Sequence, residues 1–164
     1  MNRRFEDYTA SPAHAMIWIL VALALLVVGW YGFEAWWDRR LFDAGPGRTC
    51  VNVGPHDAMA FLKAHQNTQI LDVRSAAEFK GGAVPGAVNV SIGEADFARK
   101  IAGLDREMPV LVYCAGGFRS RKAIPLLKSE EFQCIQHLHR GYHSWRFAGL
   151  PVTPDSAGND ARRN

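Results

Sequence analysis

The chain has 164 residues, enough for one domain of ordinary size, and its apolar fraction of 48% suffices for a packed core. Lys and Arg number 19 against 16 Asp and Glu, a net charge of +3 that is too small to indicate a nucleic-acid-binding protein. The three cysteines are too few and too scattered for a disulfide scaffold or a closed zinc site.

A long uncharged segment stands near the N-terminus. Residues 15–33 (AMIWILVALALLVVGWYGF) contain no charged side chain, and as a helix they would span ~28 Å, close to the thickness of a bilayer's hydrocarbon core. Aromatic rings, which favour the headgroup region, stand toward both ends, at Trp18, Trp30, Tyr31, Trp36 and Trp37. We therefore predict a transmembrane helix over 15–37, preceded by an N-terminal tail over 1–14.

Two alternatives to an anchor stay open. A buried helix of a soluble core would normally be shorter or show a polar stripe. A cleavable signal peptide would need a charged start, which Arg3 and Arg4 supply, but no small-x-small cleavage site follows the apolar segment. We favour an uncleaved single-pass anchor in a bacterial inner membrane. Its orientation is nearly balanced, since Arg39, Arg40 and Arg48 flank the other end, with a slight preference for a cytoplasmic domain.

The rest of the chain alternates strands and helices. A linker over 38–49 contains a Gly-Pro-Gly breaker, and a polar tail over 153–164 is expected to fray. Strands are expected at 51–53, 69–73, 87–92, 108–113 and 134–138, and helices at 58–64, 94–104 and 121–128. This order predicts an α/β domain over 50–152 with a mainly parallel sheet, whose ligand site would lie beyond the carboxyl ends of the strands.

The candidate chemistry follows the most apolar strand. Cys114 comes directly after PVLVY, and Gly116, Gly117 and Arg119 precede a basic helix. The glycines permit a tight loop whose backbone N–H groups form an anion nest, and the helix N-terminus adds partial positive charge. Such surroundings favour the thiolate, which is the reactive form of cysteine. Cys114 is therefore a candidate nucleophile, with an inert buried cysteine as the alternative.

Five blocks of sequence resemble rhodanese-domain sulfurtransferases. They are Cys-x-x-Gly-x-Arg-Ser at 114–120, DVRSAAEF at 72–79, PGAVN at 85–89, Leu138 with Gly141 and Trp145, and GLPV at 149–152. The resemblance implies a three-layer α/β/α rhodanese fold that needs no metal or organic cofactor. It also implies that Cys114 takes a sulfane sulfur from thiosulfate or a persulfide and passes it to a thiophilic acceptor.

The resemblance also implies roles for individual residues. Cys114 and Arg119 would be catalytic. The anion-binding loop would consist of Ala115, Gly116, Gly117, Phe118 and Ser120. Asp72, Arg74 and Glu78 would support the loop as a cluster of paired charges. The expected partners are a small anionic or persulfide sulfur donor, the membrane through 15–37, and a membrane-associated acceptor protein, without nucleic acid.

Related phosphatases and a non-enzymatic module are the competing interpretations. The phosphatases carry a loop one residue longer and a histidine where this chain has Tyr113, so sulfur transfer is favoured over phosphoryl transfer. A tethered module that carries sulfur or binds a partner without turnover is the alternative function. The donor, the acceptor and the oligomeric state are not determined by the sequence.

Departures from the family pattern mark places where this chain has its own features. The usual Gly-Gly pair is Arg140-Gly141, which changes the backbone there or adds charge near the site. Pro125 falls inside the helix after the loop, where it removes one hydrogen bond. Ala115 stands where some thiosulfate-using members carry a basic residue, which puts thiosulfate as the donor in doubt.

Further histidines, cysteines and a tryptophan have structural interpretations. His137, His139 and His143 suggest a metal cluster at first sight, but no carboxylate or cysteine accompanies them, so we set metal binding aside. Cys50 and Cys134 would pair only if their strands were neighbours, and buried free thiols are favoured. Trp145 is expected to be a core or lid residue.

Overall fold

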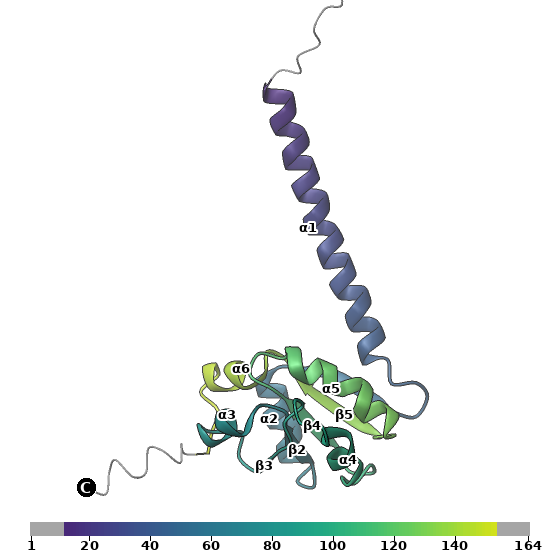
Figure 1. Ribbon diagram of the computed structural model, residues 1–164, viewed down its shortest axis with the longest axis vertical. Coiled ribbons are helices and arrows are strands. Elements are labelled where there is room, and N and C mark those ends of the chain that lie inside the picture. The colour runs from purple at the N-terminus through teal and green to yellow at the C-terminus, as the bar shows by residue number, and fades with distance from the viewer. Residues whose placement is uncertain (1–11, 154–164) are drawn as a thin grey trace, which may run out of the picture. The chain divides into compact units, whose positions relative to one another are not determined.

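The computed structural model describes residues 12–153 (Figure 1). The predicted tails at 1–14 and 153–164 lie outside the described residues, apart from their inner ends. Contacts between residues divide the chain into two compact units, Met1–Arg40 and Leu41–Asn164.

A single long helix makes up the described part of the first unit. Helix α1 (Pro12–Phe42) contains the predicted span 15–37 and continues past its predicted end. The segment His14–Phe42 has a mean hydropathy of 2.3 in its most apolar stretch, none of which is buried within the protein. The helix is therefore long and apolar enough to cross a membrane, a criterion that an N-terminal signal sequence also meets.

The second unit is built on a parallel five-stranded sheet with the strand order β1-β5-β4-β2-β3. All four pairings between neighbouring strands are parallel. The strands are β1 (Thr49–Val53), β2 (Gln69–Asp72), β3 (Ala87–Asn89), β4 (Val110–Tyr113) and β5 (Cys134–Leu138). The helices that connect them are α2 (Pro55–Ala64), α3 (Ala76–Lys80), α4 (Phe97–Ala102), α5 (Phe118–Ser129) and α6 (Gly141–Phe147).

Two apolar clusters lie on the two faces of the sheet, which gives three layers. In the fully buried strand β4, Val110 and Val112 join one cluster, whereas Leu111 and Tyr113 join the other, because successive side chains of a strand point to opposite faces. The first cluster packs against α4 and α5, and the second packs against α2 and α6 (Figure 1). The predicted three-layer α/β/α fold with a parallel sheet is confirmed.

The C-terminal end of α1 belongs to the second unit. Leu41 and Phe42, with Ala44 after the helix, pack against the first apolar cluster, so this part of the predicted linker has a fixed place in the domain. The ammonium group of Lys128 on α5 also donates to the carbonyl oxygen of Leu41, at 2.5 Å.

Several element boundaries differ from the expected ones. The strand expected at 87–92 is only Ala87–Asn89, and the helix expected at 94–104 shrinks to Phe97–Ala102. Helix α5 begins at Phe118, inside the loop motif, and continues through Pro125. The short helices α3 and α6 were not expected, because each is less than three turns long and leaves little periodicity in the sequence.

Cys50 and Cys134 lie on neighbouring strands but do not pair. Strand β1 pairs with β5 so that Thr49 stands opposite Cys134, and Cys50 stands opposite Ile135. The two cysteines therefore point to opposite faces of the sheet, and both are free thiols. Burial raises the pKa of Cys50 to about 11, so this thiol is protonated and belongs to the core.

Candidate active site

The Cys114 loop connects the carboxyl end of β4 to the start of α5. Only 1% of Cys114 is exposed. Its Sγ accepts hydrogen bonds from the backbone N–H of Gly117 at 3.1 Å and from the hydroxyl of Ser120 at 3.5 Å. Both donors favour a negative charge on the sulfur. The amide nest predicted over residues 115–120 is thus represented at the sulfur by one backbone amide and one hydroxyl.

Helix α6 is hydrogen-bonded to the Cys114 loop through its first turn. The backbone N–H groups of Tyr142 and His143, at the start of α6, donate to the carbonyl oxygens of Cys114 and Ala115, at 2.8 Å and 3.0 Å. Gly141 makes this contact possible, because a Cβ atom there would lie 2.1 Å from the oxygen of Cys114. A glycine is therefore required at residue 141.

Arg140, the departure from the Gly-Gly pattern, keeps a glycine-like backbone. Its φ of 56° and ψ of 13° place it in the left-handed region, which non-glycine residues seldom adopt. The substitution therefore adds a guanidinium group without removing the turn that leads into α6.

Arg119 forms a bidentate ion pair with Glu78. Nη1 and Nη2 of Arg119 donate to the two carboxylate oxygens of Glu78, at 2.8 Å and 2.6 Å. The same carboxylate accepts from the backbone N–H and the hydroxyl of Ser75 in a capping box at the start of α3. The hydrogen bonds from Arg119 and then Ser75 lower the pKa of Glu78 to about 2. Glu78 raises the pKa of Arg119, and the nearby Cys114 adds to this shift.

The structure divides the predicted charge cluster into two separate pairs. Asp72 and Arg74 do not join Glu78 but form their own buried ion pair, 2.6 Å between Arg74 Nη2 and Asp72 Oδ2. The same nitrogen donates to the carbonyl oxygen of Gly82 at 2.7 Å, and the guanidinium stacks 4.1 Å from the ring centre of Tyr142. This pair braces the core under the segment before β3, whereas Glu78 alone reaches the loop.

Sequence analysis missed a chain of hydrogen bonds behind the sulfur. Ser120 Oγ lies 2.8 Å from Nε2 of the buried His137, whose Nδ1 lies 2.8 Å from Asn52 Oδ1. Asn52 Nδ2 in turn lies 3.1 Å from Nδ1 of the exposed His139. Burial lowers the pKa of His137 to about 4, so the imidazole is neutral at pH 7. With Nδ1 donating to Asn52 Oδ1, Nε2 accepts, and the Ser120 hydroxyl, which has one hydrogen, donates either to this nitrogen or to the sulfur. The chain links the sulfur to solvent.

The spacing of His137, on β5, and His139, just after its end, is the signal that could have indicated this chain. In the sequence this spacing suggests only metal ligands. Within residues 12–153, no group of three or more His, Cys, Asp or Glu side chains is placed to hold a metal ion.

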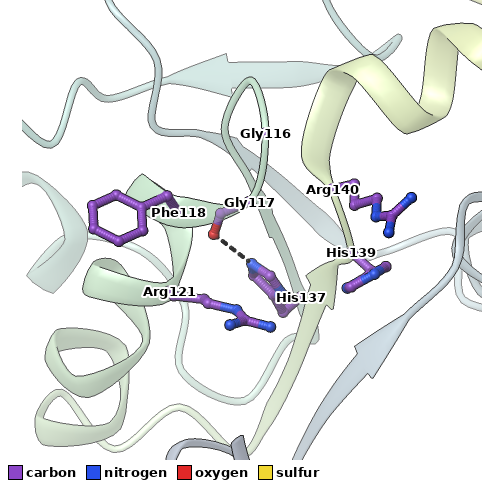
Figure 2. A pocket seen from close by; sticks show the side chains of 7 residues that line it. All are labelled: Gly116, Gly117, Phe118, Arg121, His137, His139 and Arg140. Atoms are coloured by element: carbon purple, nitrogen blue, oxygen red, sulfur yellow. Dashed lines mark hydrogen bonds between the residues drawn. The ribbon is translucent and has the colours of Figure 1, made fainter. Parts of the chain in front are cut away.

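A cavity of about 200 Å³ opens beside the loop (Figure 2). One side is formed by the start of α5 and the other by the end of β5, with His137 between them and its Nε2 3.3 Å from the oxygen of Gly117. The lining residues are Gly116, Gly117, Phe118, Arg121, His137, His139 and Arg140. Phe118, predicted as part of the anion-binding loop, is 71% exposed and lies at the start of α5, with its ring directed away from His137 (Figure 2).

Trp145 anchors the other side of α6. Its side chain is fully buried, as expected, and its Nε1 donates to the carbonyl oxygen of Pro151 at 2.7 Å. The indole thus ties the end of the domain to the helix that holds the loop.

Comparisons with known proteins agree with this architecture. Residues 55–148 match the family model described as a rhodanese-like domain. Thiosulfate sulfurtransferase GlpE of Shewanella oneidensis is 29% identical over 83 residues, which cover 51% of this chain and 80% of that protein. A rhodanese-related protein from Thermoplasma volcanium superposes with a TM-score of 0.56 at 27% identity, over 62% of this chain and 96% of that one.

Other relatives carry the domain within longer proteins. The HTH-type transcriptional regulator Rv0324 of Mycobacterium tuberculosis is 29% identical over 122 residues, which cover 70% of this chain. The match covers 53% of that regulator, so this chain spans about half the length of the relative. The family match, the parallel sheet and the loop after β4 lead to the same conclusion: the chain belongs to the rhodanese-like domain family.

Proposed function

We propose that this protein is a sulfurtransferase in which Cys114 carries a sulfane sulfur as a persulfide. The observation that carries the proposal is the Cys114 sulfur itself, 3.1 Å from the Gly117 amide in a glycine loop between a buried strand and a helix. A structural thiol has no need of a donor pointed at it. The relative named as a thiosulfate sulfurtransferase supports the same chemistry.

The reaction has two balanced steps. The Cys114 thiolate attacks the sulfane sulfur of a donor such as thiosulfate, a new S–S bond forms, and sulfite leaves with the electron pair of the broken S–S bond. A nucleophilic acceptor then attacks the outer sulfur of the persulfide, and the Cys114 thiolate leaves. Sulfur moves without an external oxidant or reductant, and covalent catalysis splits one transfer into two.

Two groups contact the sulfur in this proposal, and a third, Arg119, lies nearby. The Gly117 amide and the Ser120 hydroxyl hydrogen-bond the thiolate before attack and after release. Arg119 contributes positive charge, but Glu78 neutralises much of it. The role of the pair is therefore mainly to hold the loop against α3.

We further propose that α1 is an uncleaved membrane anchor, and that the sulfur acceptor is a membrane-associated protein. The span His14–Phe42 supports the anchor by length and hydropathy. Intact mass of the protein purified from membranes tests the anchor, since a cleaved signal sequence would give a chain that lacks this segment.

A non-enzymatic tethered module is the second candidate. The observation that favours it is the burial of Cys114, which leaves 1% of the residue exposed to a donor. Such a module would keep its cellular role in a Cys114→Ser variant, whereas a sulfurtransferase would lose it.

Intact mass spectrometry of the full-length protein in detergent tests the proposed chemistry. After treatment with thiosulfate or an inorganic polysulfide, we expect a gain of one sulfur atom that cyanide or dithiothreitol removes. Cys114→Ser should show no gain, while Cys134→Ser, at a thiol outside the loop, should behave as the unchanged protein. The absence of a gain with every donor, or a gain that persists in Cys114→Ser, would refute the proposal.

A further inference from the structure

We propose that Asn52 and His137 are positioning residues, which direct the Ser120 hydroxyl to the Cys114 sulfur when that sulfur carries a negative charge. Both act through Ser120 and not by contact with the sulfur. This inference rests on the proposed sulfurtransferase function, in which the thiolate is the attacking group, and it specifies what determines the amount of thiolate.

The Ser120 hydroxyl has several possible acceptors and only one hydrogen. Its Oγ lies 2.8 Å from Nε2 of His137, 3.1 Å from the carbonyl oxygen of Gly117 and 3.5 Å from the Cys114 sulfur. The carbonyl oxygen and the thiolate can only accept, whereas Nε2 accepts or donates according to which ring nitrogen carries the hydrogen. The state of the His137 ring therefore determines whether the hydroxyl is available to the sulfur.

The surroundings of His137 allow the ring hydrogen on either nitrogen. Nε2 also lies 3.3 Å from the carbonyl oxygen of Gly117, which favours a hydrogen on Nε2 (Figure 2). Nδ1 lies 2.8 Å from the side-chain amide of Asn52. A half-turn of that amide exchanges its oxygen for its nitrogen, so Asn52 can accept from Nδ1 or donate to it. The amide of Asn52 therefore adapts to both forms of the ring.

Two hydrogen-bond arrangements of the same heavy atoms follow. In the first, His137 Nδ1 donates to Asn52, and Nε2 accepts from the Ser120 hydroxyl. The Cys114 sulfur then keeps only the Gly117 amide as a donor, which suits the neutral thiol. In the second, the Asn52 amide donates to Nδ1, Nε2 donates to Ser120 Oγ, and the hydroxyl donates to the thiolate. The two arrangements differ by one proton, that of the thiol, which leaves to solvent.

The charges around His137 keep its ring neutral while the sulfur titrates. Burial lowers the pKa of His137 to about 4, and the positive charges of Arg121 on α5 and of His139 beyond β5 add to this shift. The Phe42 ring, 5.6 Å away between ring centres, is an uncharged neighbour. The imidazole therefore changes the position of its hydrogen and not its charge.

The ultraviolet absorbance of the thiolate measures the charge on Cys114. Full-length protein in detergent is titrated with pH, and the absorbance of the same protein with Cys114→Ser is subtracted, which removes the contributions of the other cysteines and of the tyrosines. The comparison is repeated in a His139→Gln background, so that titration of that imidazole adds nothing. This readout requires neither a sulfur donor nor access of a reagent to the buried sulfur.

Asn52→Asp is the decisive variant, because Asn52 is exposed and a carboxylate can only accept. It holds the hydrogen on Nδ1 of His137, so that Nε2 takes the Ser120 hydroxyl from the sulfur. We expect the midpoint of the thiolate titration to rise by about one pH unit, or about tenfold less thiolate at a given pH, the size of one hydrogen bond to a charged group. Val51→Asp adds the same charge on the opposite face of β1 and should move the midpoint much less.

A double-mutant cycle separates the hydrogen-bond chain from the added charge. In a Ser120→Ala background the hydroxyl is absent, so Asn52→Asp should move the midpoint no more than Val51→Asp does. The same result is expected in a His137→Leu background, and Ser120→Ala alone decides if that protein does not fold. An undiminished effect of Asn52→Asp without the hydroxyl, or equal midpoints for Asn52→Asp and the unchanged protein, would overturn the proposal.

Sulfur loading of the same proteins, followed by intact mass, separates this inference from the proposed function. If the midpoints move as expected but no donor forms a persulfide on Cys114, the proposed function fails and the role of the hydrogen-bond chain stands. If the persulfide forms and Asn52→Asp leaves the midpoint unchanged, this inference fails and the proposed function stands.

Discussion

Replacement of Gly141 by alanine should destabilise the domain by about 3–5 kcal/mol. The new Cβ would lie 2.1 Å from the Cys114 oxygen, 2.8 Å from the Ala115 oxygen and 2.9 Å from the Ala115 carbonyl carbon. All three atoms belong to the backbone, so no flexible side chain can move aside. The loop and helix α6 must therefore separate.

The magnitude follows from three physical effects. A positive φ of 57° at a residue with a Cβ costs about 1–2 kcal/mol relative to glycine. Overpacking of a close backbone contact costs about 1–3 kcal/mol. Separation also weakens the hydrogen bonds from Tyr142 to Cys114 and from His143 to Ala115, each with a net worth of about 1 kcal/mol. Part of the strain is relieved as these bonds break, so the effects are not fully additive.

Urea unfolding of the full-length protein in detergent, followed by far-UV circular dichroism, measures this change. Gly149→Ala is the matched control, since its φ is +68° but no atom lies within 4 Å of the new Cβ. It should lose only the conformational part, about 1 kcal/mol. If the two variants unfolded at the same urea concentration, the close contact between α6 and the loop would be refuted.

Three further predictions concern charges and the buried imidazole, all measured as free energies of unfolding in urea. The hydrogen bond from Arg119 lowers the pKa of Glu78 to about 2, so the ion pair stabilises the folded state fully above the ordinary carboxyl pKa. This stabilisation is lost as pH falls toward 2. In the Glu78→Gln variant the free energy of unfolding should therefore change less between pH 4.5 and pH 2. The pair is more than a third exposed, so the change is about 1 kcal/mol or less, and an unaltered profile would contradict it. Burial lowers the pKa of His137 to about 4, so between pH 6.5 and pH 4 the imidazole binds a proton in the unfolded chain but not in the folded domain, and the free energy of unfolding falls with pH. His137→Asn should make this fall less steep. A profile as steep as that of the unchanged protein would refute a buried neutral imidazole. Arg74→Met leaves the Asp72 carboxylate buried without its partner and should cost about 3–5 kcal/mol, part of which Asp72→Asn restores in the double variant; no recovery would show that Arg74 acts through packing alone.

The fold and the candidate nucleophile were predictable because their signals are local. The run PVLVY contains no polar residue, as expected for a strand covered on both faces, and all of β4 is buried. Cys114 follows that strand directly, and the glycines after it mark the loop at the edge where a parallel sheet places its ligands. Each inference needed only neighbouring residues.

The hydrogen-bond chain behind the sulfur could not be predicted, because it depends on which strands are neighbours. Asn52 of β1 stands opposite His137 of β5, 85 residues further along the chain. Without that pairing, His137 and His139 are only two histidines with one residue between them at the end of a strand. The same register determines that Cys50 and Cys134 cannot form a disulfide, because they lie on adjacent strands but on opposite faces of the sheet.

Charge spacing was also ambiguous in the sequence. Asp72 and Arg74 lie close to Glu78 in the chain. Asp72, however, is the buried last residue of β2, whereas Glu78 lies in the first turn of α3. Between them the Ser75 capping box starts α3 and turns the chain, so the Glu78 side chain and the Asp72 side chain do not face the same neighbours. Short helices of this kind fix side-chain directions that hydrophobic periodicity does not reveal.

The two sides of the Cys114 loop differ in how closely they follow the family pattern. The side that faces Glu78 has the expected arginine in a tight ion pair. The side that faces the cavity lined by Gly117 and His137 has Arg140 in place of the usual glycine, and Arg140 is also among the residues that line this cavity. In the proposed enzyme the donors to the sulfur, Gly117 and Ser120, lie within the loop itself, so a change at Glu78 or Arg140 reaches the sulfur only through the position of that loop.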